Sequence, residues 1–167
     1  GAEAANVVPV LHDDFQLRSD VWNVVSGVWS WQDGRLLESS VGSFATVVAN
    51  TVHPRNFQAR VRYRTLQPGT YRSVGFSFDY IDNGNSQDIY TSSSDAVQTV
   101  QAFHRDKGQQ VYPQPGIVKT KISVGEVTTV EITVRDQQLT IALNGEHMLD
   151  YTVPVARRDG KFALWVH

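Results

Sequence analysis

Two segments of alternating polarity, residues 57–64 and 73–80, constrain the fold of this chain more than any other feature. Their apolar positions are Phe57, Ala59, Val61 and Tyr63 in the first segment and Val74, Phe76, Phe78 and Tyr80 in the second. A period of two is that of a β-strand with one face in a core and one face in solvent. Because Gln67-Pro68-Gly69 between them is typical of a turn, we predict that the segments pair as antiparallel neighbours.

Turn residues divide the rest of the chain into short strand-like pieces. Asp33-Gly34 and Asn144-Gly145 are the strongest hairpin signals, and residues 7–15 predict a first strand. The proline-containing residues 109–121 predict an irregular excursion with strand pieces at its ends. No window shows helical periodicity of useful length. About twelve short strands separated by turns predict an all-β fold, a sandwich or a barrel.

Length and composition limit the kinds of protein that this chain can be. The 167 residues suit a single domain, which we place at 7–167, with 1–6 as a tag remnant or linker. Fifteen Lys plus Arg against 17 Asp plus Glu give a net charge of -2, which argues against a nucleic-acid partner. The chain has no cysteine and no apolar run long enough for a membrane span. Because the sequence stops in mid-strand at His167, we expect a fragment of a longer protein.

Several motifs together resemble a known fold family. They are Asp14-Phe15, Trp22, Gly27-Val28-Trp29, Asp33-Gly34-Arg35-Leu36, the GFSFDY strand at 75–80, and the closing pieces 130–134, 139–145 and 162–165. The pattern resembles the concanavalin A-like jelly roll, and more narrowly the laminin G-like and 3-keto-disaccharide hydrolase-like domains of exported bacterial multidomain proteins. The resemblance implies a two-sheet antiparallel β-sandwich in a secreted, periplasmic or cell-surface protein. The fold hosts lectins, carbohydrate-binding modules, glycosidases and adhesion domains.

The enzymatic motifs of these relatives are not reproduced. Residues 72–76 stand where the 3-keto-glycoside hydrolases usually carry Asn-Ser-Gly-Ile, and no Glu-x-Asp-x-x-Glu run is present. We therefore expect a non-catalytic carbohydrate-binding or adhesion module with its ligand on a concave sheet face. A glycoside hydrolase or lyase and a structural domain-docking module are the alternatives, and flanking domains of the same protein are expected partners.

The candidate ligand site centres on a row of arginines. The residues we assign to it are Arg60, Arg62, Arg64, Ser77, Asp79, Tyr90, Gln101 and His104. Arginines spaced by two residues on one face bind carboxylates through planar, bidentate contacts, which favours an acidic polysaccharide. The competing interpretation is a solvated face in which Asp79 and Glu131 are cross-strand partners of the arginines.

Two further features bear on the site. Calcium is the metal that residues 79–88 could hold, through the oxygens of Asp79, Asp82, Asn83, Asn85 and Asp88, although tight turns prefer the same residue types. The five histidines lack the spacing of a zinc site.

Trp165 alternates with Phe162, Leu164 and Val166 and so faces away from the core. It is either a ligand platform or a residue that a further strand covers.

Overall fold

The computed structural model describes residues 9–40, 42–66, 72–94 and 97–167, and their regular structure is almost entirely β. The strands are β1 (Trp22–Val24), β2 (Trp29–Gln32), β3 (Arg35–Glu38), β4 (Ala45–Val52), β5 (Phe57–Arg64), β6 (Ser73–Asp82), β7 (Asn85–Ser93), β8 (Gln98–Asp106), β9 (Gln109–Val111), β10 (Ile117–Lys119), β11 (Val127–Arg135), β12 (Gln138–Leu143), β13 (Glu146–Thr152) and β14 (Lys161–Val166). A 3-10 turn, η2 (Gln114–Gly116), precedes β10. No helix in the described residues has the length and apolarity to cross a membrane.

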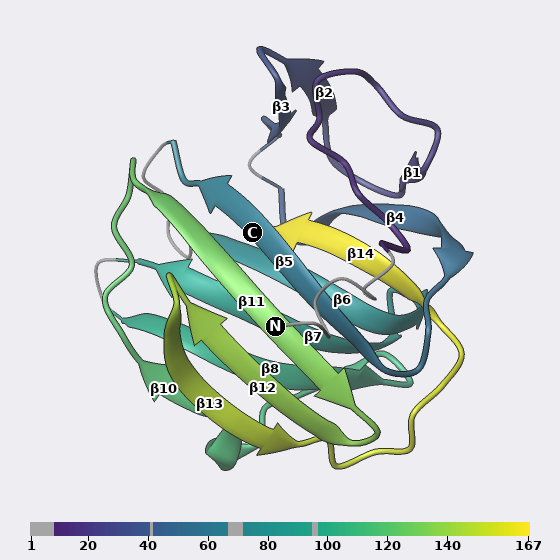
Figure 1. Ribbon diagram of the computed structural model, residues 1–167, viewed down its shortest axis with the longest axis vertical. Coiled ribbons are helices and arrows are strands. Elements are labelled where there is room, and N and C mark those ends of the chain that lie inside the picture. Colours follow the sequence, from purple (N-terminus) through teal and green to yellow (C-terminus); the bar gives the residue numbers. More distant parts are fainter. Residues whose placement is uncertain (1–8, 41, 67–71, 95–96) are drawn as a thin grey trace, which may run out of the picture.

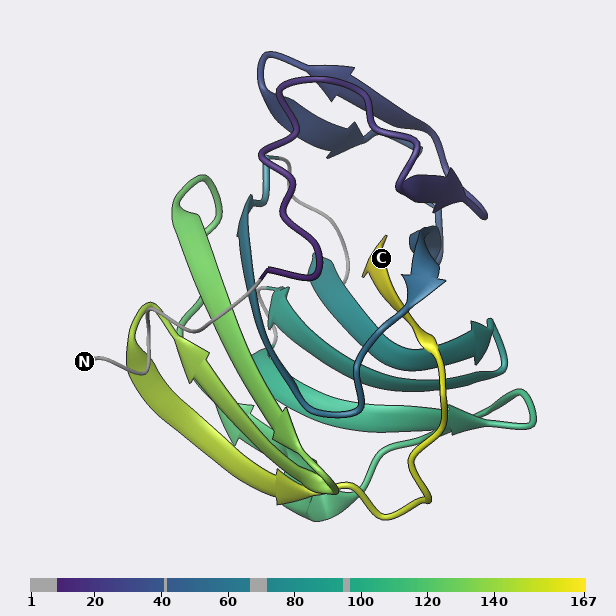
Figure 2. The ribbon, with the colours of Figure 1, turned by 45° about the vertical axis from the view of Figure 1, so that its right-hand side comes forward.

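Two antiparallel sheets face each other (Figures 1 and 2). The eight-stranded sheet has the order β1-β4-β14-β6-β7-β8-β10, with β9 paired to β8, and the four-stranded sheet has the order β13-β12-β11-β5. The hairpin β2–β3 stands at one end of the sandwich in both views. The predicted two-sheet sandwich is therefore confirmed.

The core lies between the two sheets and takes alternate residues from each strand. Its buried members include Phe76, Phe78, Ile89, Val100 and Ala102 from the eight-stranded sheet and Val130, Ile132, Val134, Leu139 and Ile141 from the four-stranded sheet. The apolar side of β5 packs against this cluster, as its alternation predicts. The hairpins at Asp33-Gly34 and Asn144-Gly145 are also confirmed, with all four residues at positive φ.

The predicted pairing of the two alternating segments is wrong. Strand β5 pairs with β11, whereas β6 pairs with β7 and β14, so the two segments belong to different sheets. A period of two fixes which side of a strand is buried but does not name its neighbour. The predicted turn at 67–69 lies outside the described residues.

The predicted first strand is also wrong for its described part, residues 9–15, which are irregular. The carboxylates of Asp13 and Asp14 accept the backbone N–H groups of Phe15 (2.7 Å) and Gln16 (3.1 Å). Such local side-chain to backbone bonds replace the ladder of a strand.

A β-bulge near the end of β6 reverses the alternation there. The register to β7 shifts between Phe78 and Asp82, and Asp79 has a φ of 49°. Tyr80 consequently leaves the core side and packs with Val48 and Ala163 on the other face of the sheet. Asp79, expected on the wet face, is instead buried.

Asp79 is held in the bulge by a clamp from the segment before β14. Arg157 donates from Nε (2.7 Å) and Nη2 (3.0 Å) to its carboxylate, and the backbone N–H of Arg158 donates a third bond (3.1 Å). His53 Nε2 accepts the backbone N–H of Asp79 (2.7 Å). Burial alone would raise the pKa of Asp79, but these donors and the neighbouring His53 ring lower it from 3.8 to about 2.

The face of the eight-stranded sheet that is turned away from the core, here called the outer face, depends on a glycine. A Cβ on Gly75 would lie 1.9 Å from Trp165 Cε2, because the indole lies across β6 at this position. Glycine is therefore the residue that lets Trp165 lie flat on the sheet.

We expect Gly75→Ala to lower the free energy of unfolding by about 2 kcal/mol, the usual scale for an overpacked site. Gly42→Ala is the matched control, since its Cβ would meet only Ser40 Oγ, at 3.3 Å. Urea unfolding of both variants checks this. Equal stability of the two would contradict the packing of Trp165 on Gly75.

The clamp predicts a pH dependence. Because the folded pKa of Asp79 lies below its unfolded value of 3.8, its stabilisation is present above pH 4 and is lost as pH falls toward 2. The stability difference between wild type and Asp79→Asn should therefore shrink by about 2 kcal/mol between pH 5 and pH 2. Stepwise denaturant unfolding across this range measures it, and a constant difference would refute the assignment.

Candidate functional site

The register of the eight-stranded sheet brings polar and aromatic side chains together on the outer face. One row across the strands is Trp165, Gly75, Tyr90, Gln101 and Ile117, and the next is Ala163, Ser77, Asp88 and Phe103. Three residues that the sequence assigned to the ligand site, Ser77, Tyr90 and Gln101, therefore share this face. The Tyr90 hydroxyl donates to Gln101 Oε1.

Asp88 is the buried charge of the outer face. Its Oδ1 accepts from Ser77 Oγ (2.6 Å), Arg105 Nη2 (2.9 Å) and Trp165 Nε1 (3.0 Å), and its Oδ2 accepts from Ser86 Oγ (2.7 Å). The donors come from β6, β7, β8 and β14. With an exposed fraction of 1 %, Asp88 is fully engaged as an acceptor.

Aromatic rings cover this buried charge. Trp165, only 2 % exposed, lies with its ring centroid 4.8 Å from Phe44, 5.9 Å from Tyr90 and 6.1 Å from Phe103. The predicted direction of Trp165, away from the core, is confirmed. Its cover comes from described residues of this chain, and Tyr112 stacks on Phe103 beyond it at 4.6 Å.

An open groove of about 380 Å³ adjoins this cluster on the outer face. Its lining combines an apolar and aromatic floor with polar walls, contributed by Asn23, Val25, Val48, Tyr80, Ile81, Asp82, Asn83 and Lys161. Tyr80 donates its hydroxyl to Asn83 Oδ1. Asp82 accepts from Asn85 Nδ2 (2.9 Å) and Gly84 N–H (2.8 Å), and these bonds lower its pKa. The groove thus offers fixed hydrogen-bonding groups around the aromatic ring of Tyr80.

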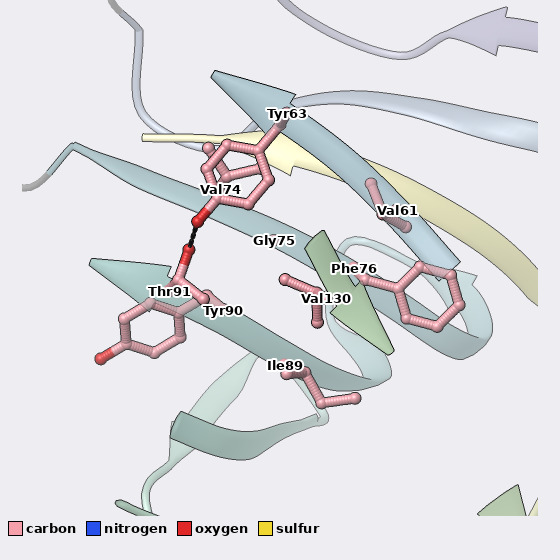
Figure 3. Close-up of a pocket in the computed structure, with 9 residues that line it drawn as sticks. All are labelled: Val61, Tyr63, Val74, Gly75, Phe76, Ile89, Tyr90, Thr91 and Val130. Atoms are coloured by element: carbon pink, nitrogen blue, oxygen red, sulfur yellow. Dashed lines mark hydrogen bonds between the residues drawn. The ribbon is translucent and has the colours of Figure 1, made fainter. Parts of the chain in front are cut away.

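A second cavity, inside the core, is too small for a ligand. Figure 3 shows its lining, in which the Tyr63 hydroxyl bonds to the Thr91 hydroxyl. Its volume is about 10 Å³, barely that of one water molecule. The core cavity therefore does not compete with the groove as a binding site.

The arginine row lies far from the other predicted ligand residues in the topology. Arg60, Arg62 and Arg64 are exposed on β5, the edge strand of the four-stranded sheet, with Glu131 directly across from Arg60. Charged side chains on an edge strand also discourage pairing with other chains. The structure thus splits the predicted site between two sheets.

Asp79 and His104 also leave the predicted face. Asp79 is bound by Arg157, and His104 lies on the core side of β8 beside Ala102. Burial lowers the pKa of His104, and its Nδ1 has no partner among the described residues.

The candidate metal ligands do not converge. Asp79 and Asp88 each pair with an arginine, Asp82 and Asn83 line the groove, and Asn85 Oδ1 accepts from the backbone N–H of Lys107 (3.1 Å). Among residues 9–40, 42–66, 72–94 and 97–167, no three His, Asp or Glu side chains gather as a metal site would require.

The groove was missed in the sequence because its walls come from distant segments. Asn23 belongs to β1, Val48 to β4, Tyr80 to β6 and Lys161 to β14. The sole local signal was the polar turn at 82–85, which the sequence assigned to calcium.

Solved structures with this architecture include proteins of sugar metabolism and recognition. Carbohydrate-binding module CBM66 from Bacillus subtilis superposes with a TM-score of 0.77 at 17% identity, over 87% of each chain. The β-glucanase of Bacillus licheniformis gives a TM-score of 0.63 at 12% identity, over 92% of this chain and 82% of that one. A putative glycosyl hydrolase from Parabacteroides distasonis gives 0.58 at 16% identity, over 88% and 82%. These likenesses confirm the concanavalin A-like jelly roll.

Sequence comparison is more specific. No curated protein matches significantly. A family model described as a 3-keto-alpha-glucoside-1,2-lyase-like domain matches residues 11–167, nearly the whole chain. The chain therefore belongs to the 3-keto-alpha-glucoside-1,2-lyase-like domain family.

Proposed function

We propose that this protein binds carbohydrate on the outer face of its eight-stranded sheet, as a non-catalytic module of a larger exported protein. The groove carries the proposal. Sugars present an apolar ring face together with many hydroxyls, and the groove offers the Tyr80 and Val48 floor with Asn23, Asn83 and Lys161 around it. The structural likeness to a carbohydrate-binding module and to a β-glucanase supports the same ligand class.

The groove is organised before any ligand arrives. Asn83 is held by the Tyr80 hydroxyl at its side chain and by Arg105 Nη1 at its carbonyl oxygen (3.2 Å). Asp82 is fixed by the turn N–H of Gly84. A pre-formed set of donors and acceptors lowers the entropy cost of ordering side chains on binding.

The carboxylates favour binding over catalysis. A glycosidase needs a carboxylic acid whose pKa is raised, paired with a second carboxylate. The pKa of Asp79 is lowered to about 2 and that of Asp82 is also lowered, while Asp88 is saturated by four donors. This arrangement supports a site that holds a sugar and does not cleave it.

Acidic polysaccharide remains part of the proposal as a ligand class. Lys161 supplies a cation in the groove, and Arg60, Arg62 and Arg64 form a separate cationic row on the four-stranded sheet. The proposal places an acidic glycan at Lys161, and variants of Lys161 and Arg62 distinguish the two surfaces.

We expect Lys161→Met to weaken binding to the best ligand about three- to tenfold, because one hydrogen bond to a charged donor is lost. The polysaccharide panel is barley β-glucan, laminarin, inulin, alginate and polygalacturonate, measured by calorimetry with calcium and with chelator. Arg62→Ala on the opposite sheet is the control and should bind as wild type does. Loss in Arg62→Ala alone would move the site to the four-stranded sheet, and silence across the panel would favour a domain-docking role.

The family match favours a second candidate, cleavage of a 3-keto-glucoside. A 3-keto group acidifies the C2 proton, so that a base can take it. The electron pair left on C2 then forms the C1–C2 double bond as the C1–O bond breaks, and the departing oxygen takes a proton from water. The groove offers Asp82 as its carboxylate base, and a lowered pKa makes it a weak one.

We therefore expect no release of the leaving group when the protein is incubated with a 3-keto-glucoside. Chromatography of the reaction mixture measures that release. Release that exceeds the buffer blank and disappears in Asp82→Asn would replace the binding proposal with the lyase. The variant Asp150→Asn, which changes an exposed carboxylate on the four-stranded sheet, controls for the loss of one charge.

A further inference from the structure

Phe44 occupies an unfavourable backbone conformation above the buried charge. Its φ is 50°, a region that bulky side chains rarely adopt. Its carbonyl oxygen is fixed by the hydroxyls of Ser26 (3.1 Å) and Thr46 (2.6 Å). The ring thereby lies over Trp165, with the centroids 4.8 Å apart.

Beneath that ring, Arg105 carries an unused donor. Its Nη1 bonds to the Asn83 carbonyl and its Nη2 to Asp88, but its Nε has no partner in the described part of the chain. The side chain is 4 % exposed, and its guanidinium carbon lies 4.8 Å from the Phe44 ring centroid. A buried N–H without an acceptor is costly and rare, and a phenyl ring accepts only weakly.

We infer that Phe44 holds the place of a sugar ring, and that bound carbohydrate displaces it. A sugar ring matches phenyl in size and can lay its C–H face on Trp165, and it also brings an oxygen for the Arg105 Nε–H. This inference rests on the proposed function and deepens it, because it adds a ligand subsite beside the groove.

Arg105 links the groove to the position of Phe44. The same guanidinium that lies under Phe44 holds the carbonyl oxygen of Asn83, which lines the groove. A glycan in the groove would thus extend one ring toward Trp165. The backbone of Phe44 is anchored through its carbonyl oxygen, so the inference requires the side chain to rotate away from Trp165 and His167.

If Phe44 competes with the ligand, removing its ring should raise affinity. Phe44→Gly is the sharpest variant, since glycine tolerates a φ of 50°. We expect about three- to tenfold tighter binding to whichever polysaccharide of the panel binds wild type best, the scale of one lost aromatic pair. Phe44→Asn, which also tolerates this backbone, should show the same direction and guards against a folding defect peculiar to glycine.

Tyr112→Ala is the matched control. It also removes an aromatic ring stacked on this face, from Phe103 instead of Trp165, and should not raise affinity. Iodide quenching gives a second readout. The quenchable fraction of the total tryptophan fluorescence should rise in Phe44→Gly as Trp165 becomes exposed, and the polysaccharide should reverse that rise. Unchanged or weaker binding of both Phe44 variants, with wild type still binding, would overturn the inference and leave the proposed function standing. If neither the wild type nor the Phe44 variants bind any polysaccharide of the panel, both the inference and the proposed function are overturned.

Discussion

The carboxylate of Asp88 is the interaction on which the outer face depends. Removing a charge from water costs several kcal/mol, and an ion pair repays this only when further hydrogen bonds complete it. Here Arg105 supplies the counter-charge, and Ser77, Ser86 and Trp165 supply the remaining donors. Because these donors belong to β6, β7, β8 and β14, the carboxylate ties together the strands that also form the groove.

A second arginine, Arg157, also ties separate segments together through a buried carboxylate, at the end of the sandwich. Arg157 neutralises Asp79 and donates to the carbonyl oxygens of Arg55 and Asp136, which precede β5 and β12. It therefore joins a bulge in one sheet to turns of the other. The bulge in turn moves Tyr80 to the outer face, where it floors the groove. The position of the groove thus follows from a buried ion pair that never touches it.

The sequence predicted the features that depend on local alternation and turns. It did not predict the features that depend on contacts between strands distant in the chain. The buried side of β5, the direction of Trp165 and both glycine hairpins follow from period and turn chemistry alone. The partner of β5 does not, because any apolar strand face satisfies the same alternation. The burial of Asp79 was equally unreadable, since the bulge that gives Asp79 a positive φ and moves Tyr80 to the outer face leaves no mark on the sequence. Ser77, Tyr90 and Gln101 came together because they lie on neighbouring strands, whereas the arginines belong to the other sheet.

The outer faces of the two sheets differ in how they hold their charged side chains. The outer face of the four-stranded sheet carries exposed Arg60, Glu131 and Asp150, the composition that solubility alone requires. On the eight-stranded sheet, the ionic groups Asp88 and Arg105 are instead buried beneath rings. Solubility does not require these charges to be buried, and apolar residues in their place would avoid the desolvation cost. The proposed carbohydrate site would give this network a role, because the buried bonds of Asp88 and Arg105 hold the aromatic rings of the face in one arrangement.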